Sequence, residues 1–261
     1  YNLGNAYTRL DRFEEALDAY DYSIAIKEDF SAAYFNKGNT YANMGRHLEA
    51  IECYQRTFEF ETPDALTCYN IGECYEQLND MHRARDFYKK ATKLDPTQTQ
   101  AWLGIGITLQ NEERWFEALH YLKKALEQDP DNGEIWFAIG DAEYHLDNLQ
   151  NAEAAYKKVL KFEPENLDIW LEYSHLMVVD DRPDEAIALI EQAISKHPEE
   201  HEYLYRLCCY LYGAGKIQEA YRVLGDALEK NISLAHTLFE YSASLKNDQQ
   251  IVDMVDQAKN R

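Results

Sequence analysis

Histidines are the first residues here that could carry catalysis or bind a metal, and the chain has eight of them. They are scattered, and none lies in an H-E-x-x-H zinc motif, a G-x-S-x-G nucleophile turn or a phosphate-binding glycine loop. His197 and His201 are four residues apart, but Pro198 between them interrupts the helix that would place both imidazoles on one face. We therefore interpret the histidines as structural or surface residues.

The cysteines and paired carboxylates give no stronger sign of chemistry. Five cysteines without a C-x-x-C pair fit neither a disulfide framework nor a zinc site, and they favour a reducing compartment. Cys208 and Cys209 are adjacent, but thiols of consecutive helical residues point about 100° apart, which favours packing over redox chemistry. Asp180 and Asp181 lie in a predicted turn, where solvated charge stabilises a helix start. The sequence predicts no enzymatic activity, no metal and no cofactor.

Composition and charge narrow the class of protein further. Among 261 residues, 26 Lys and Arg face 47 Asp and Glu, a net charge of −21 that disfavours nucleic acid and anionic membranes. No run approaches the roughly 20 apolar residues of a membrane span. With 46% apolar residues but only 11 Gly and 6 Pro, the composition favours a folded, helical chain. We expect a cytoplasmic protein that binds neither nucleic acid nor membrane.

Residues of one type recur every 34 positions along the whole chain. Alanine does so at Ala16, Ala50, Ala84, Ala118, Ala152, Ala186 and Ala220. Small residues do so at Gly4, Gly38, Gly72, Gly106, Gly140, Ser174, Cys208 and Ser242, and prolines at Pro96, Pro130, Pro164 and Pro198. A fixed period of this length is the signature of a repeat architecture rather than of a single globular core.

The segment 99–132 indicates what one repeat contains. Trp102, Ile105, Gly106 and Leu109 follow helical spacing, and a second apolar face with Ala118, Tyr121, Leu122 and Ala125 follows the polar stretch 110–114. The Asp129-Pro130 turn ends the second helix. Small residues at 106 and 118 would let the two helices approach closely, with Trp102 and Leu122 filling the space beside them.

These residues resemble the tetratricopeptide repeat family, whose signature begins W-x2-L-G-x2-Y and continues with A-x3-F, A and P. The first seven residues, Tyr1 to Tyr7, match its opening, and Trp102, Trp136 and Trp170 hold its Trp position. The resemblance implies one all-α, right-handed solenoid of about 16 antiparallel helices. Its eight units would be 1–30 (truncated), 31–64, 65–98, 99–132, 133–166, 167–200, 201–234 and a degenerate cap, 235–261. Tyr1 would be the fifth residue of a helix, so we expect the natural protein to extend upstream.

In this family the first helix of each pair lines a concave groove that binds peptides or proteins, and three columns of residues would lie there. The first column begins with three amides, which could grip the backbone of an extended peptide, as in the similar amide ladder of O-linked N-acetylglucosamine transferases. The second column is apolar throughout, and the third is acidic in its middle, where it could steer a basic peptide. The candidate groove residues are Asn2, Asn36 and Asn70 in the first column; Tyr1, Phe35, Tyr69, Phe137 and Tyr205 in the second; and Asn5, Asn39, Glu73, Asp141 and His175 in the third.

Each column also has a structural explanation. Asn and Tyr are common at these family positions, an aromatic stripe is usually core, and an acidic groove can reflect an acidic surface as a whole. The clamp that holds acidic chaperone C-termini in some relatives needs cations where this chain has Tyr1, Leu66 and Asn70, so that role is disfavoured.

The sequence therefore predicts a non-enzymatic scaffold that binds a protein or an extended, possibly basic peptide in the groove. The alternative is the substrate-recruiting region of a larger enzyme, such as a glycosyltransferase with its catalytic domain elsewhere. Self-association into a homo-oligomer through the groove or the terminal surfaces stays open but is not indicated.

Overall fold

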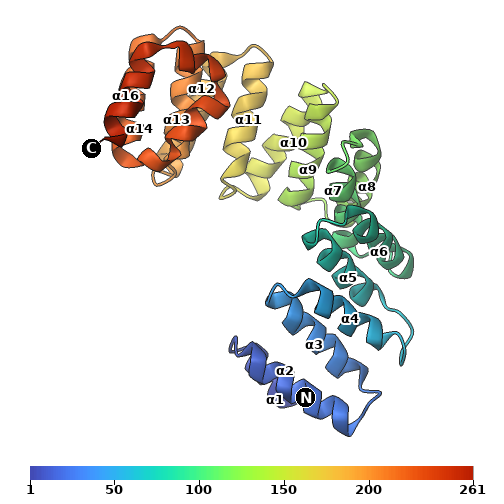
Figure 1. The fold of residues 1–261 in the computed structure, drawn as a ribbon. Coiled ribbons are helices and arrows are strands. Elements are labelled where there is room, and N and C mark those ends of the chain that lie inside the picture. The colour runs from blue at the N-terminus through green and yellow to red at the C-terminus, as the bar shows by residue number, and fades with distance from the viewer. Residues whose placement is uncertain (261) are drawn as a thin grey trace. The chain divides into compact units, whose positions relative to one another are not determined.

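The structure, a computed structural model, describes residues 1–260, and the last residue of the predicted eighth repeat, residue 261, lies outside them. These residues form sixteen α-helices and no strand, which confirms the all-α prediction. Contacts divide the chain into two compact units, Tyr1–Asp147 and the part that begins at Asn148. The first runs from blue to green in Figure 1 and the second from yellow-green to red. The expectation of a single array over the whole chain stays a prediction.

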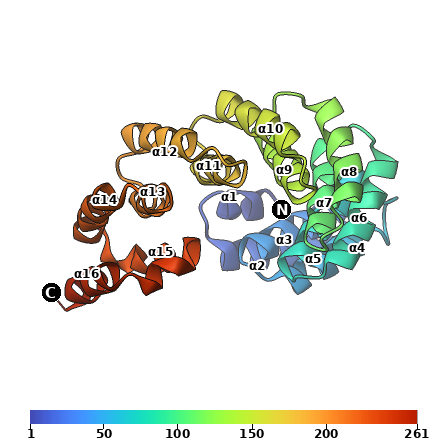
Figure 2. The ribbon, with the colours of Figure 1, turned by 90° about the horizontal axis from the view of Figure 1, so that it is seen from above.

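The first unit holds four helix pairs and the first helix of a fifth. Its helices are α1 (Asn2–Thr8), α2 (Phe13–Ile26), α3 (Ser31–Asn43), α4 (His47–Thr57), α5 (Ala65–Gln77), α6 (Met81–Leu94), α7 (Thr99–Gln110), α8 (Trp115–Gln128) and α9 (Gly133–His145). Each first helix packs on its own partner and on the second helix of the preceding pair. Within this unit α3, α5 and α7 lie on one side, and α4, α6 and α8 on the other (Figure 2). We call the side formed by the first helices the A face.

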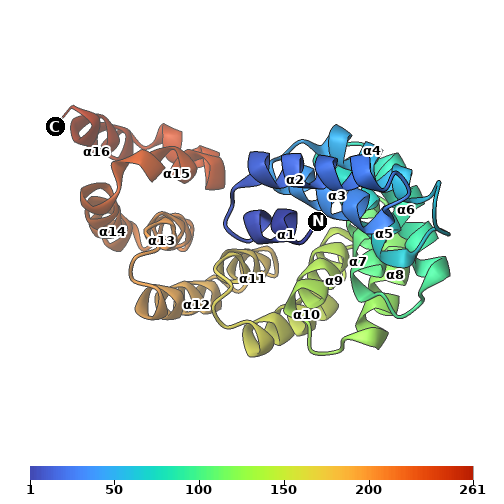
Figure 3. The same cartoon turned by 90° about the horizontal axis from the view of Figure 1, so that it is seen from below.

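The second unit repeats the arrangement and then becomes irregular. Its helices are α10 (Leu149–Phe162), α11 (Asp168–Val179), α12 (Pro183–Lys196), α13 (Glu202–Gly213), α14 (Ile217–Lys230), α15 (Ala235–Tyr241) and α16 (Gln249–Lys259). Here too α11 and α13 lie on one side, and α12 and α14 on the other (Figure 3). The first helix of the last pair, α15, has only seven residues and is followed by the 3-10 turn Ala243–Asn247.

The 34-residue period comes from the packing of each pair. All seven ladder alanines are fully buried, because each lies where a second helix meets the first helix of its pair. The small residues of the other ladder face a large side chain of the same pair: a Cβ added at Gly72 would lie 2.6 Å from the Tyr88 ring. Leu122 fills this space against Gly106, as predicted. Trp102 does not; it is half-buried, and its Nε1 donates to the Pro96 carbonyl at 2.8 Å, because the ring lies across the turn between units.

A third ladder lies in the turns within the pairs. Seven residues 34 positions apart have positive φ angles: Asp11, Gly45, Asn79, Glu113, Asp147, Asp181 and Gly215. This left-handed conformation reverses the chain between the two helices, and Gly, Asn and Asp adopt it at little cost. The second helices accordingly start at 13, 47, 81, 115, 149, 183 and 217, always 34 residues apart. The sequence carried this signal, but the polar stretch around it was interpreted only as a break.

Candidate functional site

The amides on the A face of the first unit bind one another across successive pairs. Asn36 Nδ2 donates to the Tyr1 hydroxyl at 2.9 Å and to Asn5 Oδ1 at 3.0 Å, and the Tyr20 hydroxyl donates to the same Asn5 oxygen. These bonds occupy both amide protons of Asn36, which leaves its Oδ1 as the group that can still meet a ligand.

The next pair repeats this arrangement with a longer bond. Asn70 Nδ2 donates to Asn39 Oδ1 at 3.3 Å, and the Tyr54 hydroxyl donates to that oxygen at 2.7 Å. Asn2, the first amide of the column, is exposed and forms no side-chain hydrogen bond within the described residues. The predicted amide column is therefore largely a set of bonds between pairs, and its use by a peptide stays a prediction.

The amide pattern stops at the third pair, where an acidic pocket replaces it. Glu73 stands in the place of Asn39, and Gly104 in the place of Asn70. The Tyr88 ring lies between Gly72 and Gly104, since an added Cβ at either glycine would come within 2.6 Å of it. Its hydroxyl then donates to Glu76 Oε2 at 2.5 Å, while the Tyr69 hydroxyl donates to Glu73 Oε1 at 2.7 Å.

The acidic pocket has a volume of about 180 Å³. Three carboxylates reach it, and the pocket is lined by Tyr69, Glu73, Glu76, Gln77, Tyr88, Gln100, Leu103, Gly104, Ile107 and Glu134. Glu73 and Glu76 form no ion pair with Lys or Arg in the part of the chain that the structure describes. Burial raises the pKa of Glu76 and of Tyr88, so negative charge here is held at a cost. A cation is the complement that this pocket lacks.

A second pocket, which we call the apolar pocket, lies on the same face at the ends where α3 and α5 begin. Its volume is about 290 Å³, and it is lined by Tyr1, Ser31, Ala32, Phe35, Asn36, Thr57, Glu61, Thr62, Asp64, Leu66 and Thr67. Leu66 is 52% exposed, and Tyr1 and Phe35 are half-buried, so an apolar surface is open there. The start of α5 is fixed by Asp64, whose side chain accepts a hydrogen bond from the Thr67 amide. The structure thus brings Tyr1, Phe35 and Asn36 of the predicted residues together here.

Two further predicted residues of the first unit lie on α9. Asp141 is half-buried and accepts a hydrogen bond from Gln110 Nε2 at 2.9 Å. Burial raises the pKa of its carboxyl, and His145, whose Nε2 lies 3.5 Å away, opposes that rise. Phe137 is half-buried on the same helix. Neither residue lines one of the two pockets, so their role in binding stays a prediction.

In the second unit one predicted groove residue is wrong. Tyr205 is completely buried, and its hydroxyl donates to the Asn231 carbonyl at 2.7 Å, because the turn after α14 covers it. His175 is half-buried, and its pKa is lowered by burial and by the neighbouring charge of Arg206. The sequence placed Arg206 in the amide column but did not single it out as functional.

The residues with intrinsic reactivity are arranged for packing. All five cysteines are buried and unpaired. Burial raises the pKa of Cys53 and of Cys74 to about 11 and that of Cys209 to about 12, so these thiols stay protonated at neutral pH. No three His, Cys, Asp or Glu side chains among the described residues are grouped so that they could hold a metal ion. Among the same residues, no helix combines the length and the apolar character needed to cross a bilayer.

Repeated antiparallel helix pairs with a ladder of small residues define a helical-hairpin repeat protein. Family models match the chain over three segments: a tetratricopeptide repeat model over 29–97, a TPR repeat model over 4–45, and the TPR domain of cytochrome c-type biogenesis protein H over 119–232. The chain belongs to the tetratricopeptide repeat family. No curated protein matches it in sequence.

Several solved structures are similar to this fold. The C-terminal part of a TPR repeat-containing protein from Cytophaga hutchinsonii is 14% identical, with a TM-score of 0.75, over 97% of this chain and 98% of that one. MamA from Desulfovibrio magneticus is 20% identical, with a TM-score of 0.61, over 65% of this chain and 96% of that one. YrrB, described as a TPR protein with an unusual peptide-binding site, is 23% identical, with a TM-score of 0.56, over 64% and 87%.

Proposed function

We propose that this chain is a protein-interaction scaffold, and that its first unit binds an extended peptide along the A face. An apolar side chain of the peptide enters the apolar pocket, and a Lys or Arg side chain enters the acidic pocket. The observation that carries the proposal is the second pocket, in which Glu73 and Glu76 lie without a cationic partner among the described residues. The likeness in fold to YrrB, whose description names a peptide-binding site, supports the same kind of ligand.

The two pockets share helix α5, which sets the spacing that a peptide must have. Leu66 lines the apolar pocket and Glu73 the acidic pocket, seven residues further along the helix. Seven helical residues span about 10 Å, which an extended chain covers in about three residues. The preferred peptide therefore carries its basic residue about three positions from its apolar residue. The free Oδ1 of Asn36 could accept one of its backbone amides.

Fluorescence anisotropy with labelled decapeptides tests this proposal. The probe is a Gly/Ser chain with Leu and Arg three positions apart, compared with peptides in which the spacing is zero or six, or Arg is replaced by citrulline. Binding should be tightest for the three-residue spacing and weakest for citrulline. Glu73→Gln with Glu76→Gln should weaken binding by about tenfold, because a charge-assisted contact in a partly buried pocket is lost.

The matched control removes two carboxylates from the opposite side of the same unit. Asp18→Asn with Glu52→Gln makes the same change in net charge at exposed positions of α2 and α4. If this control weakens binding as much as the pocket variant, only the overall charge attracts the peptide and the proposed pocket is wrong. Equal affinity for the Arg and citrulline peptides would also reject it. The alternative of a recruiting region in a larger enzyme would use this same face.

A further inference from the structure

Arg206 in α13 is a buried cation for which the described chain supplies no carboxylate. Its side chain is 8% exposed, and it forms no ion pair within the described residues. Its Nε is buried without a hydrogen-bond partner. Removing a guanidinium from water without a counter-ion is costly, so an unpaired buried arginine needs an explanation.

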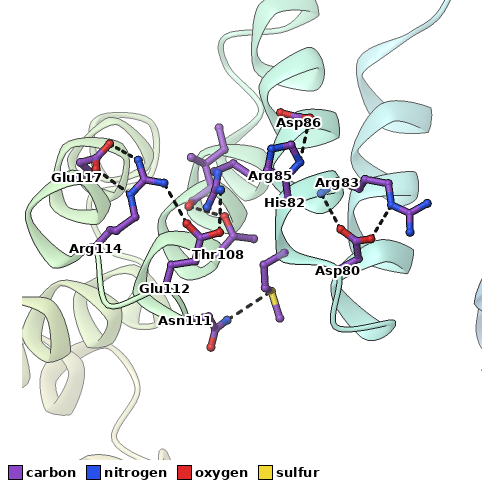
Figure 4. A network of polar contacts seen from close by, with 12 residues as sticks. Asp80, His82, Arg83, Arg85, Asp86, Thr108, Asn111, Glu112, Arg114 and Glu117 are labelled. Carbon is purple, nitrogen blue, oxygen red and sulfur yellow. Dashed lines mark hydrogen bonds and ion pairs between the residues drawn. The ribbon is translucent and has the colours of Figure 1, made fainter.

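The other buried arginine of the chain shows the usual solution. Arg85, in α6, donates from Nη2 to Glu112 Oε1 at 2.8 Å, and Glu112 also pairs with Arg114 (Figure 4). The neighbouring turn therefore provides the carboxylate that Arg85 needs. Arg206 has no such residue beside it, although the chain as a whole has 47 acidic residues.

The position of Arg206 places it on the A face of the second unit. It stands in the column of Asn36 and Asn70, and its charge lowers the pKa of His175, which stands in the column of Asn5 and Asn39. The Arg206–His175 neighbourhood thus repeats the contact between pairs that the amides make in the first unit. There, residues of the same column, Asn36 and Gly104, line the two pockets.

The aromatic neighbour of Arg206 leaves its hydrogen-bonding edge available. The guanidinium carbon lies 3.6 Å from the centre of the Tyr241 ring, and a stacked guanidinium keeps its N–H groups pointing outward in its own plane. The Tyr241 hydroxyl donates to Glu202, which lies one turn before Arg206 on α13. Tyr241 therefore stacks on Arg206 and also holds the nearest carboxylate of its helix in another bond.

We propose that Arg206 binds a carboxylate of a partner chain, either an acidic side chain or a C-terminus. A planar carboxylate matches the in-plane N–H pair of a guanidinium, and one negative charge suits a single cation in an acidic protein better than a phosphate dianion does. The site lies wholly in the second unit and does not depend on the peptide proposed for the first. A partner could then present basic and acidic groups to different units.

Side-chain ¹⁵N NMR of the whole chain labelled at arginine tests the site directly. The probes are N-acetylglycine, with a terminal carboxylate, acetyl-glutamate amide, with a side-chain carboxylate, and acetyl-glutamine amide, with none. We expect the Arg206 Nε–H signal, assigned by its loss in Arg206→Gln, to shift saturably with at least one carboxylate below about 50 mM at constant ionic strength. Which probe binds more tightly distinguishes the two sources. The exposed Arg222 of α14 serves as the control signal, and Arg222→Gln should leave the shift unchanged.

Three outcomes would overturn the proposal. They are no saturable shift, an equal shift with the neutral probe, and saturation by inorganic phosphate alone. Tyr241→Phe keeps the ring but frees Glu202 to pair with Arg206, so it should weaken the carboxylate several-fold. The thermal midpoint of Arg206→Met separates binding from packing: a midpoint equal to or above that of the wild type fits a ligand site, and a clear fall makes Arg206 a structural residue.

Discussion

Gly104→Ala is the sharpest test of how Tyr88 connects packing to the acidic pocket. A Cβ at residue 104 would lie 2.6 Å from the Tyr88 ring, whose opposite side already faces Gly72 at the same distance. The ring cannot move away from one glycine without meeting the other. Overpacking of this kind costs about 1–3 kcal/mol, and the higher helix propensity of Ala returns about 1 kcal/mol. The variant should therefore lose about 0.5–2 kcal/mol of unfolding free energy.

The same substitution at Gly213 provides the matched control. Gly213 is the last residue of α13, and no atom lies within 4 Å of its added Cβ, so Gly213→Ala should be neutral or stabilising. Urea unfolding followed by hydrogen exchange of α6 and α7 peptides measures both the loss and its place. Because Tyr88 also bonds Glu76, the variant should weaken the Leu and Arg decapeptide as well. Gly104→Ala that is as stable as Gly213→Ala would refute the packing argument.

Three other predictions follow from the turns, the amides and the buried ion pairs. Glu113 holds a φ of 58° in its turn, so Glu113→Gly should stabilise the chain by about 0.5–1 kcal/mol in urea unfolding; a loss, as expected for Glu112→Gly, would contradict this. Asn36→Ala should cost about 1–2 kcal/mol because two hydrogen bonds are lost, whereas Asn2→Ala should cost nothing; equal thermal midpoints would count against the ties between pairs. The Arg182 hydrogen bond lowers the pKa of Glu153 to about 2, below its unfolded value, so about 1–3 kcal/mol of stability is present above pH 5 and is lost towards pH 2. The stability difference between wild type and Arg182→Gln should shrink over that range, and a constant difference would be evidence against the assignment.

The sequence predicted the elements well because one packing rule repeats. Each ladder alanine is buried where two helices of a pair meet, and each second helix from α2 to α14 begins 34 residues after the last. A period carries this information without any knowledge of the neighbours. The left-handed turn residues were equally regular, but their types vary among Asp, Asn, Glu and Gly, which hid the ladder.

The candidate site was harder to predict because exposure depends on irregular neighbours. Tyr1, Phe35 and Tyr69 are half-buried, but Tyr205 in the same column is enclosed by the turn that follows α14. The periodic pattern assigns these four residues the same environment. Likewise, the bonds of Asn36 and Asn70 to the preceding pair could not be read from amide identity alone. Glu73, Glu76 and Glu134 were placed near one another because the period does determine which residues share a face.

The left-handed turn residues also bear on how a chain of this kind can change its length. Because every pair from the first to the seventh reverses direction through the same single-residue conformation, each 34-residue segment leaves the backbone in the orientation in which it arrived. A gene duplication or deletion of one whole segment would then join without a new loop, whereas a change of a few residues would misalign every helix after it. Growth by whole segments is the evolutionary route that this backbone geometry permits most readily.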